Sequence, residues 1–420
     1  MNIISERNLF INTSSVPVGN GRDVSINLPQ GYADCAFGEQ MRMTLSTFLM
    51  EKKFYDVNET NNIFFLVAVK EGGTTLADII SKPIVIQSGN YKSFGGQQTY
   101  GTGEATPNDT AKWYNNRGIG YQLVTQIEKA LGVTWDESNS RYDRNADGIY
   151  PGTGNTASTA RNIVTVTHGS VSGQWTIVID ATVLVASPVA INYNFKLFSF
   201  ELSQGANNTI VQTITNGKGI FVDTHELLGG CSVSKINNLQ EPAAFSDINL
   251  LTQMFTPSAE SNNKGTYTGH FQASLKTLEA VYVRTNLSSS NYQTASFDSG
   301  NDLYPFVISS DILAKIPIYT STVATSSETN YPLYSKSDPI QTLNVQYGYN
   351  DETFPAEYIS FIDQGGHTFS MMLNTNHVSQ IRMFLTDDKG RLIPWESNGQ
   401  ETCNEMYFTA TLKVTITKPL

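Results

Sequence analysis

The C-terminal part of the chain contains the run Thr411-Leu412-Lys413-Val414-Thr415-Ile416-Thr417, in which polar and apolar residues alternate. Successive side chains of a β-strand point to opposite faces of a sheet, so a period of two predicts a strand with one buried face. Branched residues such as Val, Ile and Thr also favour the extended backbone. The run therefore predicts a half-buried strand, and similar patterns recur through the sequence.

A β-hairpin is predicted between residues 163 and 179. The β-branched runs Ile163–Thr167 and Trp175–Ile179 flank the short segment His168–Gly173, which is rich in Gly and Ser. Two such runs around a turn segment are typical of paired antiparallel strands. Further strands are predicted at residues 63–69, 84–87, 191–202, 278–284, 359–362 and 381–386. So many short strands indicate an all-β protein.

Helix is the minority element. Between residues 117 and 131, apolar side chains recur at helical spacing and share one face: Ile119, Leu123, Val124, Ile127 and Leu131. Gly132 follows, and glycine is common directly after a helix because it adopts the left-handed backbone of that position. A second, shorter helix is predicted over residues 247–254, with Ser246 as its N-cap.

The composition excludes disorder for most of the chain and does not favour nucleic-acid binding. Charged residues make up 15% of the chain and hydrophobic residues 40%, whereas disordered chains combine low hydrophobicity with high charge. The net charge of −11 would repel a phosphate backbone unless the basic residues clustered. The longest basic run is Lys52-Lys53, so no contact with nucleic acid is expected.

The length predicts two or three domains, and the strand pattern favours two. A chain of 420 residues is too long for one antiparallel β-sandwich and sits well with two in tandem. The most polar and least periodic connector near the middle is Ser203–Gly219. We therefore expect one sandwich over residues 1–215 and a second over residues 216–420. Long loops, which on a β scaffold usually carry contacts, are predicted at residues 99–109, 150–160, 257–269 and 320–331.

No segment suggests membrane insertion or export. Every apolar run is interrupted well before the ~20 residues that a spanning helix requires, and the N-terminus lacks the pattern of a signal peptide. Cys35, Cys231 and Cys403 are odd in number and far apart, which suits neither a disulfide framework nor a zinc site. We expect three small buried thiols in a protein that folds inside a cell.

The sequence contains no complete catalytic motif. His225-Glu226-Leu227-Leu228-Gly229 begins like the helix of zinc proteases, but its fifth residue is Gly instead of the second His. The other histidines, His168, His270, His367 and His377, are scattered, which favours structural roles. Gly101-Thr102-Gly103 lacks the third Gly of a dinucleotide fingerprint. The sequence therefore predicts no catalytic or cofactor-binding residue, no cofactor, and a protein that is not an enzyme.

A calcium loop is considered at Asp143-Arg144-Asn145-Ala146-Asp147-Gly148. Oxygen-bearing side chains stand at positions one, three and five, and Gly stands at six, as in the first half of such a loop. Position twelve, which should supply a bidentate Glu, is Gly154. Asp, Asn and Gly are also the residues of tight turns. We favour the turn and predict no metal site.

Adjacent carboxylates leave an acid/base site open as an alternative. The pairs are Asp136-Glu137, Asp351-Glu352 and Asp387-Asp388. Neighbouring acids in polar surroundings are usually solvated turn residues, and Asp387-Asp388-Lys389-Gly390 follows a predicted strand as a loop would. A carbohydrate-active β-sandwich that uses two carboxylates remains the alternative on this pattern.

Five segments, taken in order, resemble those of a known family. They are Phe54–Phe65, Ser88–Tyr91, Val281–Leu287, Asp311–Ile318 and Phe384–Arg391. In the order of these segments, the chain resembles the capsid proteins of icosahedral double-stranded DNA viruses. The resemblance implies a double jelly roll, that is, two eight-stranded sandwiches in tandem that assemble as trimers of pseudo-hexagonal outline.

The expected function follows from both lines of reasoning. We expect a structural virion protein, a major or minor capsid subunit, that assembles as a homotrimer and with other shell proteins, without direct contact to nucleic acid and without membrane insertion. It would fold and assemble in the host cell interior and reside in the virion. The alternative is a surface-recognition module, a lectin-like or receptor-binding head that uses long loops on a β-sandwich.

Overall fold

The structure of the protein is a computed structural model that describes part of the chain. The described residues are 2–15, 23–52, 55–58, 61–73, 78–89, 91, 99–100, 118–156, 158–169, 171–185, 191–204, 210–213, 224–231, 244–245, 253–275, 280–285, 339–344, 358–363, 370–373, 376–386, 393 and 407–418. Strands far outnumber helices among them, and every strand pair is antiparallel. The predicted all-β class is confirmed.

The chain divides into two compact units that are nested in the sequence. Unit 1 comprises Met1–Phe54, Leu278–Thr325 and Tyr331–Leu420, and unit 2 comprises Tyr55–Thr277 with Ser326–Asn330. This division differs from the expected boundary near residue 215, which falls inside unit 2. The physical reason is that the last strand pairs with the first one, so both ends of the chain have to belong to the same unit.

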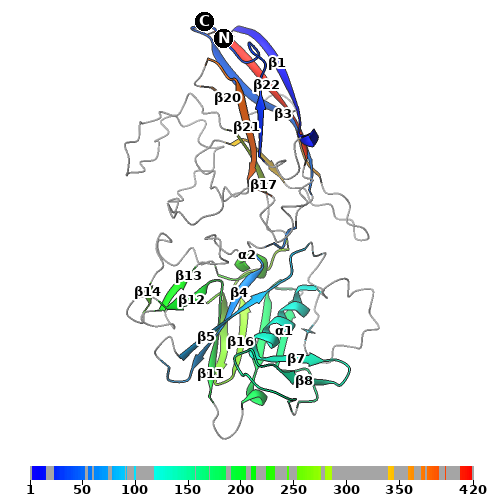
Figure 1. The fold of residues 1–420 in the computed structure, drawn as a ribbon, viewed down its shortest axis with the longest axis vertical. Coiled ribbons are helices and arrows are strands. Elements are labelled where there is room, and N and C mark those ends of the chain that lie inside the picture. The colour runs from blue at the N-terminus through cyan, green and yellow to red at the C-terminus, as the bar shows by residue number, and fades with distance from the viewer. Residues whose placement is uncertain are drawn as a thin grey trace. The chain divides into compact units, whose positions relative to one another are not determined.

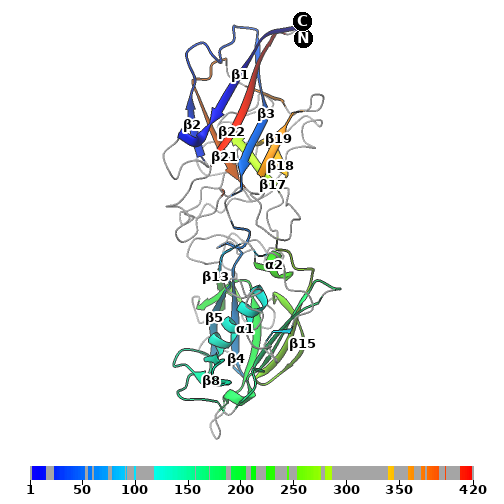
Figure 2. The same ribbon diagram turned by 90° about the vertical axis from the view of Figure 1, so that its right-hand side faces the viewer.

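The first sheet of unit 1 joins the two ends of the chain. Its strands run in the order β1-β22-β3-β19, and β20 also pairs with β3. Asn2 lies opposite Lys418 in the register, and the two termini lie together in Figure 1. Figure 2 shows β1, β22, β3 and β19 side by side in this order. The strands span Asn2–Asn12 (β1), Phe408–Lys418 (β22), Gln40–Glu51 (β3), Tyr358–Ile362 (β19) and Ser370–Met372 (β20).

The second sheet of unit 1 completes a sandwich. Its order is β18-β17-β21-β2, with strands at Pro339–Asn344 (β18), Ala280–Thr285 (β17), Gln380–Thr386 (β21) and Asp23–Asn27 (β2). One hydrophobic core contains residues of both sheets, among them Met43 and Val414 of the first and Val283 and Met383 of the second. Two antiparallel sheets that share one core form a β-sandwich, as predicted.

The alternating pattern of β22 is confirmed. Leu412 and Val414 are buried, whereas Thr411 and Lys413 are partly exposed. On the inner face, Phe408 stacks on Phe48 of β3 with ring centroids 5.3 Å apart. This face of the strand therefore lies in the core, as the period of two predicts.

Unit 2 contains two larger sheets and a helix around one core. The sheet orders are β15-β16-β10-β9-β6 and β11-β4-β5. Side chains of both sheets and of helix α1 form one hydrophobic cluster. The opposite face of β4 belongs to a separate cluster with β11, so β4 is buried on both faces. The elements span Phe255–Ser261 (β15), Lys264–Gly269 (β16), Trp175–Asp180 (β10), Val164–His168 (β9), Thr99–Tyr100 (β6), Tyr193–Phe198 (β11), Ile63–Lys70 (β4), Ile79–Val85 (β5) and Gly118–Leu131 (α1).

Helix α1 forms as its periodicity predicts. The five apolar residues of the predicted face are all buried, and the helix packs against β9, β7 and β5. Gly132 follows with φ of 101°, and its amide donates to the carbonyl oxygens of Glu128 and Lys129. The chain then forms the hairpin of β7 (Val133–Asp136) and β8 (Arg141–Arg144).

The expected connector at Ser203–Gly219 is part of a small sheet. Glu201 pairs with Thr213 and Gln204 with Ile210, and the sheet order is β12-β13-β14. The described parts of the segment, residues 203–204 and 210–213, are therefore paired strands inside unit 2. The elements are Glu201–Gln204 (β12), Ile210–Thr213 (β13) and Ala244–Phe245 (β14); the short helices are Thr224–Leu228 (α2), Thr13–Ser15 (η1) and Thr182–Leu184 (η4).

The predicted loop at residues 257–269 is wrong, because this segment forms most of the β15–β16 hairpin. Its turn residue Asn263 has φ of 64° and is buried. The side-chain oxygen of Asn263 accepts hydrogen bonds from the Tyr150 hydroxyl at 2.6 Å and from the Tyr193 amide at 3.0 Å, and its amide nitrogen donates to Asn192 at 2.7 Å. The hydrogen bonds of Asn263 hold the hairpin. Its sequence therefore lacks the alternation of apolar residues by which a strand is predicted.

The other sequence predictions have mixed outcomes. The hairpin β9–β10 and the strands β4, β17, β19 and β21 match their predicted segments. The predicted strand at 84–87 overlaps β5 only at its last two residues, 84 and 85, and the predicted strand at 191–202 is two strands, β11 and β12. The predicted loop at 150–160 contains no helix or strand where it is described. The predicted helix at 247–254 lies outside the described residues except for Gln253 and Met254, and so do residues 101–109 and 320–331.

Candidate functional site

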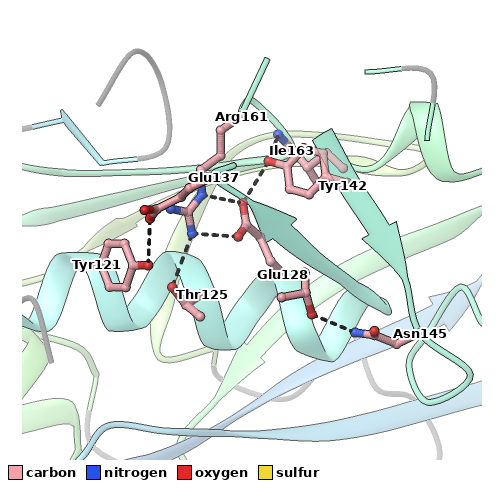
Figure 3. Close-up of polar contacts among 9 residues, drawn as sticks. Tyr121, Thr125, Glu128, Glu137, Tyr142, Asn145, Arg161 and Ile163 are labelled. Atoms are coloured by element: carbon pink, nitrogen blue, oxygen red, sulfur yellow. Dashed lines mark hydrogen bonds and ion pairs between the residues drawn. The ribbon is translucent and has the colours of Figure 1, made fainter. Parts of the chain in front are cut away.

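A buried ion pair joins helix α1 to the segment that precedes β9 (Figure 3). Arg161 donates from Nη2 to Oε2 of Glu128 at 2.8 Å and from Nε to Oε1 at 3.2 Å. Only 1% of the Glu128 side chain and 7% of the Arg161 side chain are exposed. The Tyr142 hydroxyl, on β8, donates to Oε1 of Glu128 at 2.8 Å and accepts from the Ile163 amide at 3.2 Å. The pair therefore ties three parts of unit 2 together.

The same guanidinium extends this network to the surface of the helix. Nη2 of Arg161 also donates to the Thr125 hydroxyl at 3.2 Å, and the guanidinium carbon lies 5.0 Å from the ring centroid of Tyr121, a cation–π distance. The Tyr121 hydroxyl donates to Glu137 at 3.4 Å. Figure 3 shows these side chains converging on the guanidinium of Arg161.

The electrostatics of this network favour a structural role. Burial raises the pKa of the Glu128 carboxyl, and the hydrogen bonds and charge of Arg161 act against that rise. Burial likewise raises the pKa of the Tyr142 phenol, and the neighbouring Glu128 raises it further. Oε1 of Glu128 accepts hydrogen bonds from Arg161 and Tyr142, and Oε2 accepts one from Arg161. The carboxylate is therefore engaged in contacts that stabilise the fold. Sequence analysis does not identify these residues.

The five segments that resemble those of capsid proteins are called here the family-like segments. The first two of them, Phe54–Phe65 and Ser88–Tyr91, come together in the structure. Val57 and Gly89 exchange backbone hydrogen bonds of 3.1 Å and 2.9 Å. Beside them, Asn61 accepts from the Asn58 amide at 2.8 Å and donates to the Asp56 carbonyl oxygen at 2.8 Å. Asn58 and Asn61 are each 1% exposed. These asparagines therefore fold the chain where it enters unit 2.

Ser88–Tyr91 is also linked to helix α1. Gln122 of the helix accepts from the Gln87 amide at 2.6 Å and donates to the Tyr91 hydroxyl at 2.8 Å. The Tyr91 hydroxyl donates to the Gln87 carbonyl oxygen at 2.5 Å. The second family-like segment is thus held to the helix by a closed set of hydrogen bonds.

The third and fifth family-like segments pair within unit 1. Tyr282 lies opposite Thr386 and Val283 opposite Leu385 in the β17–β21 register. Arg284 is 2% exposed, and its Nε donates to the Thr386 hydroxyl at 2.9 Å. The fourth segment, residues 311–318, lies outside the described residues. Every described family-like segment therefore has a role in the framework.

The calcium-like residues take structural positions. Asp143 lies in β8, where its Oδ1 is 3.2 Å from Nε of Arg141. The Asn145 side chain donates to Thr134 at 3.0 Å. A Cβ at Gly148 would overlap the backbone of Gly132, so close backbone packing requires the glycine. Asp143 and Asn145 therefore make contacts within the β7–β8 region, and the absence of a metal site stays a prediction.

The described histidines lie in separate elements, each with its own neighbours. His168 contacts the Gly173 carbonyl oxygen at 3.2 Å and lies edge-on to Trp175, and burial lowers its pKa. His270 contacts the Thr256 hydroxyl at 3.2 Å, and His377 pairs with Asp34. His225 lies in the short helix α2, and His367 lies outside the described residues.

The adjacent carboxylates that can be placed act in a turn. Oδ1 of Asp136 accepts from the Ser138 and Asn139 amides at 2.9 Å and 3.2 Å, an Asx-type arrangement that closes the β7–β8 hairpin. A hydrogen bond from the Asn139 side chain is the main cause that lowers the pKa of Asp136. Glu137 accepts from Tyr121 at the edge of the Arg161 network. Residues 351–352 and 387–388 lie outside the described residues.

The cysteines differ slightly from expectation. Cys35 and Cys231 are free thiols and are half-buried instead of fully buried; Cys403 lies outside the described residues. In the part of the chain that the structure describes, no three His, Cys, Asp or Glu side chains gather as a metal ion would require. None of the described helices is both long enough and apolar enough to span a membrane.

Comparison with known proteins yields structural neighbours only. No protein-family model matches the sequence, and no curated protein does. Among solved structures, a selenomethionine-labelled mavirus penton protein aligns over 98% of both chains with 10% identity and a TM-score of 0.34. A chain of the Sputnik virophage, solved by cryo-electron microscopy, aligns over 98% of both chains with 10% identity and a TM-score of 0.31. TM-scores this low do not establish a common fold.

Proposed function

We propose that this chain is a structural virion protein, a subunit of a viral shell that assembles with copies of itself and with other shell proteins. The observation that supports this most is the role of the family-like segments. Val57 bonds to Gly89 across two of them, and Tyr282 pairs with Thr386 across two others. The resemblance to capsid proteins thus rests on residues that pair within the framework. Such residues are the ones that a shared architecture is expected to constrain.

The surface chemistry agrees with this role. Charged residues make up only 15% of the chain, and a surface of Ser, Thr and Asn meets another copy without burying many unpaired ions. The acidic balance suits a shell layer without contact to the genome. Glu128 and Asp136 both accept hydrogen bonds within the fold, and this engagement supports a protein that is not an enzyme.

The finer assignment is a homotrimer located in the virion, formed in the host cell interior and without membrane insertion. Electron micrographs of the purified chain test it. Triangular or hexagonal particles, together with a sedimenting mass of a trimer or more at micromolar concentration, are the expected result. A strictly monomeric chain at that concentration contradicts the proposal. A monomer that binds glycans would favour the surface-recognition module instead.

A further inference from the structure

The outer face of the sheet β1-β22-β3-β19 carries large exposed apolar side chains. Phe10 on β1 is 78% exposed and Ile362 on β19 is 68% exposed. Leu49 on β3 is 47% exposed. Their neighbours Ile11 and Phe48 are buried in the sandwich core, and Phe361, next to Ile362, is partly buried against the same core. Because side chains alternate along a strand, Phe10, Leu49 and Ile362 point away from that core.

These residues form ordered rows across the sheet. Phe10 lies opposite Thr411, Thr411 opposite Thr47, and Thr47 opposite Ile362. One row therefore has a large apolar residue at each edge and two threonines in the middle. The Thr47 hydroxyl donates to the Thr411 hydroxyl at 2.8 Å, so the centre of the row is internally bonded. With strands ~4.8 Å apart, the two apolar ends are separated by about 14 Å.

One ion pair lies beside this row. Lys413, two residues from Thr411 on the same face of β22, lies 2.8 Å from the Glu6 carboxylate. Glu6 lies two residues before Asn8 in β1, and Asn8 is the register partner of Lys413. A face whose lysine is neutralised within the sheet has little attraction for a phosphate backbone or an anionic headgroup. The outer face of this sheet is therefore complementary to another uncharged, partly apolar surface.

We propose that this outer face, defined by Phe10, Thr47, Leu49, Ile362 and Thr411, binds the same face of a second copy of the chain. The twofold axis of this contact lies between the two facing sheets, parallel to the strands and over the line midway between β22 and β3. A half-turn about it exchanges the two edges of the sheet. Phe10 of each copy then faces Ile362 of the other, and the threonines face each other. Such a self-complementary patch is what an isologous contact requires. This inference rests on the proposed function and adds a twofold contact that joins neighbouring capsomers.

Two single variants and their mixture test this geometry. Phe10→Lys and Ile362→Glu each place a charge at one edge of the face, so each alone should weaken association by about tenfold or more. In a mixture, the positive charge that F10K adds to one copy faces the negative charge that I362E adds to the other. The second contact of that pair remains Phe10 against Ile362. The mixture should therefore recover association. Sedimentation equilibrium of the full chain measures the mass in all cases.

Val171→Lys is the matched control, because Val171 is 96% exposed but lies in unit 2, outside the outer face. It should associate as the wild type does. Circular dichroism and urea unfolding should show that all variants fold. If the wild type assembles and both single variants assemble equally well, the outer face is not the contact and the proposed function stands. If the single variants weaken association but their mixture does not recover it, the half-turn arrangement is wrong. A wild type that never assembles overturns the proposed function itself.

Discussion

Nη2 of Arg161 lies 2.8 Å from Oε2 of Glu128, and almost no solvent reaches either side chain. The ion pair links the helix α1 to the segment before β9 through residues that are far apart in the sequence. A buried charge of this kind is tolerated only because its partner is present. The attachment of the helix to this segment therefore depends on both members of the pair.

Removal of the arginine should be strongly destabilising. In Arg161→Met, Glu128 is left buried without its counter-ion, so the free energy of unfolding should fall by about 3–5 kcal/mol. Urea unfolding followed by tryptophan fluorescence measures it, because Trp135 and Trp175 both lie in unit 2. Arg141→Met is the matched control: its side chain is 42% exposed, and the loss should be about 1 kcal/mol or less. Equal losses would contradict the structural role of the buried pair.

The two faces of β22 should respond differently to substitution. Val414 is 1% exposed, so Val414→Asp places an unpaired carboxylate in the core and should abolish soluble expression. Lys413→Gln removes only a surface pair with Glu6 and should change the free energy of unfolding by about 1 kcal/mol or less. Soluble yield and urea unfolding measure the two effects. Similar behaviour of both variants would mean that β22 does not bury one face.

The β15–β16 turn should depend on both the backbone and the side chain of Asn263. Asn263→Gly keeps access to the left-handed backbone but loses the hydrogen bonds with Tyr150, Tyr193 and Asn192. Asn263→Ala loses these bonds and also strains the backbone, so it should be less stable than Asn263→Gly by about 1 kcal/mol. Thermal unfolding of the two variants measures the difference. An alanine variant as stable as the glycine variant would contradict the turn geometry.

Acidification should weaken unit 2 through His168. Burial lowers the pKa of its imidazole below the ordinary value of 6.5, and the contact with the Gly173 carbonyl oxygen opposes this only in part. As the pH falls through about 6.5, the unfolded chain binds a proton that the folded protein does not, so the free energy of unfolding decreases. The urea midpoint should fall between about pH 7 and about pH 5, and less so in His168→Gln. Equal decreases in both proteins would assign the effect to other groups.

Local periodicity explains which elements are predictable from the sequence. The strand β22 and the helix α1 each bury one face along a continuous stretch, so their periods of two and of 3.6 are visible in the sequence. The edge strand β1 buries only Ile11, and the β15–β16 hairpin is held by Asn263. Neither has an apolar pattern to read.

The nesting of the units and the ion pair require contacts that no local pattern contains. Nothing near Leu9 indicates that it pairs with Leu412. Glu128 does leave a signal, because it falls between Val124 and Leu131 on the apolar face of the predicted helix. Its partner Arg161 lies in an irregular segment, where composition alone does not distinguish it from a solvent-exposed arginine.

The pairing of β1 with β22 also determines the order of events during translation. Unit 2 is synthesised almost completely before the last strands of unit 1 emerge from the ribosome, and nascent domains generally fold as they emerge. The first sheet of unit 1 is incomplete until β22 arrives and fills the place between β1 and β3. Phe10 and Ile362 therefore lie on one continuous surface only after β22 has been synthesised. If the outer face binds a second copy, this timing delays that contact until β22 has joined the sheet.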